Sequence, residues 1–281
     1  MRVYVDGIGL CGPGLNGWAA SRPVLSGLAP YVAAPTIVPP SDLLPANERR
    51  RTVPTVKLAL AVSAEAFASA RRDASDVATV FASSGGDGDT IHQIFDALAS
   101  SNPELSPTRF HNSVHNAPAG YWSIATHSHA PSSSLCCHDA SFAAGLLEAT
   151  VQTTVGDRAV ALVAYDLPAP EPLNSLRPIG ACFGLALILA PRASQASLAS
   201  LDFEIRRRNS ASVMVSDALE TLRQGTPAAR SLPLLAALAQ NTAEAISLEF
   251  VSSLEIGLLL QPVNFEQTSL SDAHAKSEYQ A

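Results

Sequence analysis

Short apolar runs that alternate with longer helical segments constrain the fold of this chain more than any other feature. The runs at 77–82, 158–166 and 180–190 are almost continuously apolar, as strands buried on both faces are. Segments 55–72 and 141–155 carry apolar residues at spacings of three and four, which is typical of helices. We therefore expect an α/β protein in the order β-α-β-α-α-β-α-β-β, with helices on both sides of a mostly parallel sheet.

The ends of this series are marked by turn residues. The first strand is expected to begin at Arg2 and to stop at Gly12. Seven prolines recur between Pro13 and Arg51, so that region is expected to be mostly irregular. A polar loop that begins at Ser106 should lead into a short helix, with a buried strand after it.

A shorter series follows Pro191. It comprises a strand at 201–208, helices at 210–224 and 228–240, and strands at 245–253 and 256–262. This order repeats the first series in abbreviated form. We expect one domain at 1–262, with a complete first half at 1–191, a reduced second half at 200–262, and a polar tail at 263–281.

Charge and composition exclude several classes of function. The net charge of -7 and the pI near 5.4 argue against nucleic-acid binding, which needs clustered Lys and Arg. Only 15% of the residues are charged, against roughly 25% in ordinary soluble domains, so either a large interface with another chain or an Ala-rich composition bias is indicated. The basic runs at 49–51 and 206–208 are interpreted as solvated faces, with an acidic protein partner as the alternative.

Cysteine usage and hydropathy bear on the compartment. Four cysteines in 281 residues do not resemble a disulfide framework. The N-terminus lacks the charged and apolar segments of a signal peptide, and no apolar run approaches the length of a membrane span. We expect a cytoplasmic protein without a membrane span, and we expect no cofactor and no metal.

The stretch "SSSLCCHDASFAAGLLEA", 132–149, predicts a strand, a sharp turn and a helix, with Cys136 as the last strand residue and Cys137 at the turn. A thiol at a helix N-terminus lies near the positive end of the helix dipole, which favours the thiolate. Cys137 is therefore a candidate nucleophile, and the question is which group would act as its base.

A metal site is one alternative for this stretch. The available ligand types are His127, His129, Cys136, Cys137 and His138. Their spacing differs from the usual zinc patterns, and adjacent thiols on a strand point to opposite faces. We favour a structural interpretation, with Cys136 buried and the histidines hydrogen-bonded in loops.

A Cys-His hydrolase or acyltransferase is a second alternative. It would use Cys137 as nucleophile, His115 or His138 as base, and Asp139 to orient the base. The side chain of His138 diverges from that of its neighbour at such a turn, whereas His115 belongs to an adjoining loop.

Two other polar segments are interpreted as structural. In "FHNSVHNAP" the residues that would cap a helix and satisfy buried backbone groups are Asn112, Ser113, His115 and Asn116. The run "SSGGDGD" lacks the Lys of a phosphate loop, and its aspartates would repel phosphate. Its glycines more simply permit a tight turn from strand to helix.

Four passages carry a family resemblance. They are "VYVDGIGLCGPG", "VFASSGGDGD", "LSPTRFHNSVHNAPAGYWSI" and "HDASFAAGLLEA", and they span most of 2–190. In them the chain resembles the β-ketoacyl synthases of the thiolase fold, and more closely the truncated, chain-length-factor-like relatives of bacterial aryl polyene and other type II polyketide pathways. The resemblance implies a thiolase-like fold, with a complete βαβαβαββ first half and a reduced second half.

The same resemblance implies a nucleophile position without its usual partners. In the family the nucleophilic Cys lies at the turn between the third strand and third helix, and counting back from Gly145 assigns that position to Cys137. Two His residues and a lysine-bearing segment, which drive decarboxylation, come from loops of the second half. Here only His274 follows His138. Condensation by this chain alone is therefore not expected, and Cys137 would be vestigial.

The resemblance finally implies a partner. Thiolase-fold enzymes dimerise by pairing the third strand across a two-fold axis, which places 129–135 at such an interface. We expect a non-condensing chain length factor that forms a heterodimer with a full-length ketosynthase. The pair would shape the tunnel in which a chain held by an acyl carrier protein grows, in aryl polyene, polyketide or fatty-acid-like elongation. The tunnel or interface candidates are Phe110, Asn112, His115, Asn116, Tyr121, Ser133, Ser134 and His138. The alternative function is an independent acyltransferase or thioester hydrolase that uses Cys137.

Overall fold

The computed structural model describes residues 1–40, 42–101 and 103–263. The strands are β1 (Arg2–Gly12), β2 (Leu15–Asn16), β3 (Ala78–Ala82), β4 (Ser132–Leu135), β5 (Val160–Asp166), β6 (Phe183–Ala190), β7 (Ala199–Arg207), β8 (Glu244–Glu249) and β9 (Leu254–Pro262). They form one sheet in the order β4-β3-β5-β6-β1-β7-β9-β8, and β2 pairs with β1.

Helices lie on both sides of this sheet. They are α1 (Trp18–Leu25), α2 (Ala46–Arg51), α3 (Pro54–Ala70), α4 (Gly88–Ala99), α5 (Pro107–Asn112), α6 (Ala117–Thr126), α7 (Ser141–Gly156), α8 (Leu173–Leu176), α9 (Asp217–Gly225) and α10 (Leu232–Gln240). Short 3-10 helices are η1 (Ala74–Asp76), η2 (His138–Ala140) and η3 (Pro227–Ser231). The predicted α/β class is confirmed, and the predicted elements of the first series are present, with β2, α1, α2, α8 and a third helix between β3 and β4 in addition.

The prediction of a mostly parallel sheet is wrong. Only the pairs β3–β4 and β3–β5 are parallel, and β5–β6, β6–β1, β1–β7, β7–β9 and β8–β9 are antiparallel. A continuous apolar run reports burial on both faces, and that burial comes from the helices whatever the strand direction. The run therefore does not fix the direction of a strand.

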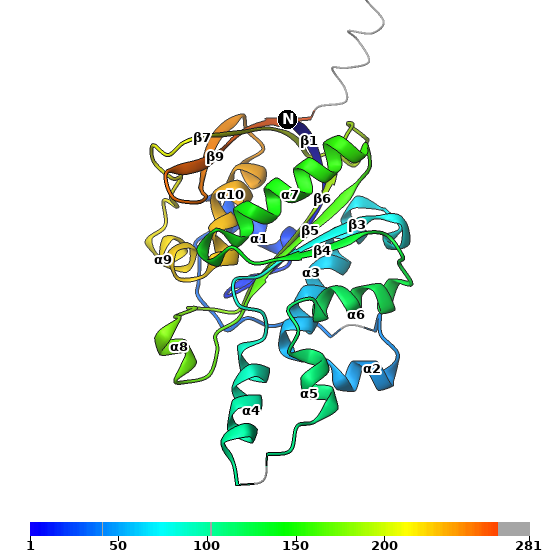
Figure 1. Cartoon of the computed structure of the whole chain (residues 1–281). Coiled ribbons are helices and arrows are strands. Elements are labelled where there is room, and N and C mark those ends of the chain that lie inside the picture. Colours follow the sequence, from blue (N-terminus) through cyan, green and yellow to red (C-terminus); the bar gives the residue numbers. More distant parts are fainter. Residues whose placement is uncertain (41, 102, 264–281) are drawn as a thin grey trace, which may run out of the picture.

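Two apolar layers hold the helices to the sheet. Alternate residues of the central strands point toward α3 and α6 on one face, as Phe81, Val163 and Ile188 do. Their neighbours point toward α7 on the other face, where α1 and α10 complete the layer. Beyond β1 the strands β7, β9 and β8 continue the sheet and cover α10, so α10 lies between two parts of one sheet (Figure 1).

The outward face of β7, β9 and β8 carries paired charges. The Arg206 guanidinium donates to Glu255 at 2.7 Å, to Glu204 at 2.8 Å and to the Ser247 hydroxyl at 2.5 Å. Burial alone would raise the pKa of Glu255, but hydrogen bonds from the Asn209 N–H, Arg206 and Ser247 hold it below its ordinary value. This face of the sheet therefore presents hydrogen-bonded polar side chains to solvent.

Some helix boundaries differ from the sequence expectations. Helix α1 interrupts the proline-rich region that we expected to be irregular, and it contains Pro23. Helix α9 begins at Asp217 and not at residue 210, because the Ser216 hydroxyl caps it by accepting from the Leu219 N–H and the β-branched Val213 and Val215 precede that cap. The predicted polar tail, from residue 264 onward, lies outside the described part of the chain.

Close backbone contact between β1 and α3 requires glycine. A Cβ at Gly9 would lie 1.9 Å from the Val62 carbonyl oxygen, and a Cβ at Gly7 would lie 2.3 Å from that of Ala66. Because the contact is with backbone, no side-chain rotation relieves it.

We expect Gly9→Ala to lower the free energy of unfolding by at least about 2 kcal/mol, since α3 must move off the sheet. Urea unfolding followed by circular dichroism measures this change. Gly85→Ala is the matched control, because a Cβ at that position would have no other atom within 4 Å and the φ of Gly85 is ordinary. Equal stability of the two variants would contradict the close contact.

Candidate functional site

The candidate site lies where the parallel strands β3, β4 and β5 end together. Cys137 precedes η2, which leads directly into α7. The Cys137 N–H donates to the Ser141 hydroxyl at 3.0 Å, and that hydroxyl donates to the His138 carbonyl at 2.7 Å. The strained residue of the turn is His138, whose φ is +50°. The predicted strand, turn and helix are present, with β4 ending at Leu135.

The Cys137 thiol has no imidazole partner within the described chain. His115, the best candidate base, instead places Nε2 at 3.1 Å from the Ser83 carbonyl oxygen. His138 is largely exposed and its Nδ1 lies 3.5 Å from an Asp139 oxygen. No hydrogen bond to the Cys137 sulfur occurs among these residues, and His274 lies outside them. The arrangement offers a half-buried thiol without a base.

Asp139 is engaged by arginines and does not orient a histidine base. Arg177 donates to it at 2.6 Å and Arg230 at 3.1 Å. Burial alone would raise the pKa of Asp139, but the two guanidinium groups outweigh it and lower that pKa. Arg230 also pairs with Glu249 at the end of β8. The turn after Cys137 is thus fixed to the strands that follow Pro191.

Cys136 differs from the expectation of a buried residue. It is exposed, and its thiol donates to the Ser84 carbonyl at 3.0 Å. It follows the last residue of β4 and so lies in the turn, not in the strand. Within the described residues, no group of three or more His, Cys, Asp or Glu side chains is placed to hold a metal ion.

The predicted interface serines lie on β4, which is an edge strand. The Pro131 carbonyl accepts from the Thr79 N–H of β3, and the Leu135 carbonyl accepts from the Ser83 N–H just after β3. Because backbone groups of a parallel strand alternate in direction, the N–H groups of Ser132 and Ser134 point away from β3. Ser133 turns its hydroxyl toward α7 and accepts from the Gln152 amide at 3.2 Å.

A groove of about 520 Å³ runs beside this free edge. It is lined by His115, Asn116, Gly120, Ser132 and Ser134, among others. The structure therefore brings four of the predicted interface candidates, His115, Asn116, Ser133 and Ser134, to β4 and the groove next to it.

The remaining candidates divide into buried and exposed residues. Tyr121 is only 1% exposed and packs edge-on against His111, so it fills the core of this chain. Asn112 is also buried, and its amide donates to the Arg51 carbonyl at 2.8 Å. Asn116 precedes α6 but makes no capping hydrogen bond. Phe110 on α5 is 63% exposed.

Sequence reasoning missed the apolar surface of α4. This helix extends away from the sheet beside α5 (Figure 1), and we call α4 and α5 together the arm. Of its residues only Thr90 is buried, while Phe95 and Leu98 are each more than half exposed. Asp87 caps α4 by accepting from the Thr90 N–H at 2.8 Å. The amphipathic spacing of Ile91, Phe95 and Leu98 was the available signal.

Sequence reasoning also missed Asp166, at the end of β5. Its carboxylate accepts from the Ser84 N–H and the Ala228 N–H, each at 2.8 Å, and from the Ser83 hydroxyl at 3.3 Å. It therefore connects the end of β3 to η3. Burial raises the pKa of Asp166 to about 6, although these hydrogen bonds oppose the rise.

Comparison with known proteins decides the family. The family model described as beta-ketoacyl synthase, N-terminal domain, matches residues 25–249. The chain belongs to the β-ketoacyl synthase family. A search of curated proteins gave no match. The thiolase-like ketosynthase fold is accordingly the fold of this chain.

Several solved ketosynthase structures share that fold. One is a ketosynthase, ApeO, in complex with its chain length factor, ApeC, from Xenorhabdus doucetiae, with 21% identity, a TM-score of 0.70, and coverage of 92% of this chain and 99% of that chain. Another is the AntDE:AntF complex, a type II polyketide synthase acyl carrier protein with its ketosynthase, with 15% identity, a TM-score of 0.72, and coverage of 93% and 99%. The ishigamide ketosynthase/chain length factor has 13% identity, a TM-score of 0.69, and coverage of 94% and 99%.

We expect the raised pKa of Asp166 to make stability depend on pH. A carboxyl whose folded pKa exceeds its unfolded value stabilises the fold below the unfolded pKa, and this contribution is lost as the pH rises through about 6. Between pH 4 and 7 the unfolding free energy of the wild type should fall relative to that of Asp166→Asn, by on the order of 2 kcal/mol. Urea unfolding across this range measures the difference. A relative gain of wild-type stability with rising pH would contradict the assignment.

Proposed function

We propose that this chain is a non-condensing ketosynthase-like subunit of the chain-length-factor type. It pairs with a full-length β-ketoacyl synthase and helps to shape the tunnel in which an acyl chain grows on a carrier protein. The observation that carries the proposal is the free edge of β4, together with an arm on which Phe95 and Leu98 are more than half exposed. Apolar surface of this kind is stable in water when a partner covers it.

The chemistry of the turn supports the non-condensing part of the proposal. Cys137 occupies the position that the family resemblance assigns to the nucleophile, yet its sulfur has no histidine partner in the described chain. A thiol without a base is a poor nucleophile for acyl transfer. The solved ketosynthase–chain length factor complexes of the same fold support the pairing.

The finer parts of the proposal concern the pathway, the residues that face the partner and the domain bounds. We assign the pathway to aryl polyene, polyketide or fatty-acid-like elongation in the cytoplasm. Phe110, His115, Asn116 and Ser134 would face the partner, and His138 would lie near the tunnel mouth. We also treat 1–262 as one domain, in which 200–262 is the reduced second half. For the described residues, no helix is long and apolar enough to cross a membrane.

Pairing through β4 makes a specific prediction for Ser134→Pro. Proline removes the outward N–H and leaves the hydrogen bonds to β3 in place, so we expect loss of the heterodimer with an unchanged fold. Co-expression with a tagged ketosynthase, followed by light scattering, measures the complex. Ser134→Ala, which keeps the N–H, should pair normally. The proposal would be contradicted if the wild-type chain formed a homodimer and had no affinity for any ketosynthase.

Cys137→Ala tests the alternative of an independent acyltransferase or hydrolase. Because the thiol lacks a base, we expect the amount and the chain length of the pathway product to stay within about twofold of wild type. Product analysis after expression of the complete pathway makes this measurement. Loss of product, together with acylation of the wild-type thiol by an activated thioester, would favour the enzyme.

A further inference from the structure

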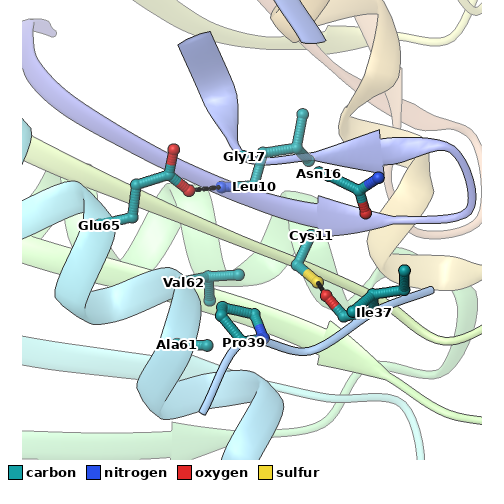
Figure 2. Close-up of a pocket in the computed structure, with 9 residues that line it drawn as sticks. All are labelled: Leu10, Cys11, Asn16, Gly17, Ile37, Pro39, Ala61, Val62 and Glu65. Carbon is teal, nitrogen blue, oxygen red and sulfur yellow. Dashed lines mark hydrogen bonds between the residues drawn. The ribbon is translucent and has the colours of Figure 1, made fainter. Parts of the chain in front are cut away.

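Two pockets adjoin along α3, on the face of the sheet opposite α7. The first has a volume of about 490 Å³ and is walled by Leu10 and Cys11 of β1, Ala61 and Val62 of α3, and Pro39 (Figure 2). The second has a volume of about 370 Å³, and its apolar wall includes Val38, Pro40, Leu44 and Leu60. Pro39 lines both pockets, so the two adjoin at residues 36–40, here called the strap, and the pair of pockets is called the groove.

At the inner end of the groove the Glu65 carboxylate and the Cys11 thiol are hydrogen-bonded within the chain, and the exposed Asn16 lies at the rim. The two Glu65 oxygens accept from the Trp18 N–H at 2.6 Å and from the Leu10 N–H at 2.9 Å. The Cys11 thiol donates to the Ile37 carbonyl at 3.5 Å, and burial raises its pKa to about 11, which keeps it neutral (Figure 2). This end therefore suits an apolar group that makes no hydrogen bond.

The outer end of the groove is positively charged. Arg49 and Lys57 line the second pocket. Arg49 is paired with Asp42. The Lys57 ammonium is exposed and has no carboxylate partner among the residues that the structure describes, and the same is true of Arg50 on α2. An anion at the outer end would therefore meet an uncompensated cation.

The dimensions and the strap suit an elongated ligand. Lys57 and Glu65 are eight residues apart on α3, which corresponds to about 12 Å along the helix. The strap belongs to no helix or strand, and the Thr36 hydroxyl holds it by donating to the Cys182 carbonyl at 2.7 Å. Lifting the strap would break few hydrogen bonds, so a ligand can enter from the side.

We propose that this groove binds a medium-chain fatty acid, with its carboxylate at Lys57 and its hydrocarbon tail beneath Pro39, between α3 and β1. Three strands of the sheet separate β1 from β4, so the groove is distinct from the Cys137 turn and from the β4 edge. The binding does not depend on the function proposed above.

Isothermal titration of the full chain with octanoate, decanoate and dodecanoate tests the tail. Each added methylene buried in the groove contributes about 0.8 kcal/mol, so two carbons should strengthen binding roughly tenfold until the groove is full. Ala61→Phe fills the groove and should abolish binding of decanoate and of decanol. Thermal unfolding confirms that the variant is folded. Unchanged affinity in folded Ala61→Phe would overturn the proposal.

Lys57→Glu tests the carboxylate. We expect it to weaken decanoate binding at least about tenfold and to leave decanol binding within about twofold, since only the acid has a charge for Lys57 to contact. Arg22→Glu is the matched control, because Arg22 is an exposed cation on α1 away from the groove. Equal decanoate affinity of the two variants, or no saturable binding by the wild type below the micelle concentration, would overturn the proposal.

Discussion

The antiparallel pairing of β1 with β7 is the interaction on which the rest of the structure depends. Arg2 through Val5 pair with Asp202 through Ala199, so the strands after Pro191 extend the first sheet. The extension covers α10, and η3 comes to lie where Ala228 donates to Asp166 and Arg230 pairs with Asp139. Backbone hydrogen bonds and a partly exposed ion pair in this way join the segment after Pro191 to the first sheet.

The two edges of the sheet differ in a way that favours the addition of a partner strand at one of them. At one edge, β8 begins and ends with Glu244 and Glu249, and charged side chains discourage the addition of another strand. At the other edge, β4 carries three serines and no charge. The arm begins just after β3 ends, at the edge of the sheet where the parallel neighbour β4 also ends. A partner that adds a strand at β4 can therefore also cover the arm.

The sequence predicted elements better than it predicted their arrangement. Apolar periodicity located α3, α7 and the central strands, because burial leaves a pattern in the residues themselves. Strand direction and the shared sheet depend on contacts between residues far apart in the chain, such as Tyr4 with Ser200, and leave no local pattern. For the same reason the sequence located Cys137 and β4, but not Asp166, whose role comes from η3 about sixty residues later. The burial of Tyr121 depends in the same way on α3 and α5.

The central claim is that a ketosynthase partner pairs with the free edge of β4. Hydrogen exchange tests it most directly, because it measures the outward backbone amides of β4. The amides of Ser132 and Ser134 point to solvent in the isolated chain, whereas that of Ser133 points to β3. With saturating full-length ketosynthase, exchange at Ser132 and Ser134 should slow at least about tenfold while Ser133 changes little. Unchanged exchange at Ser132 and Ser134 within a formed complex would show that the partner binds elsewhere and would contradict the account.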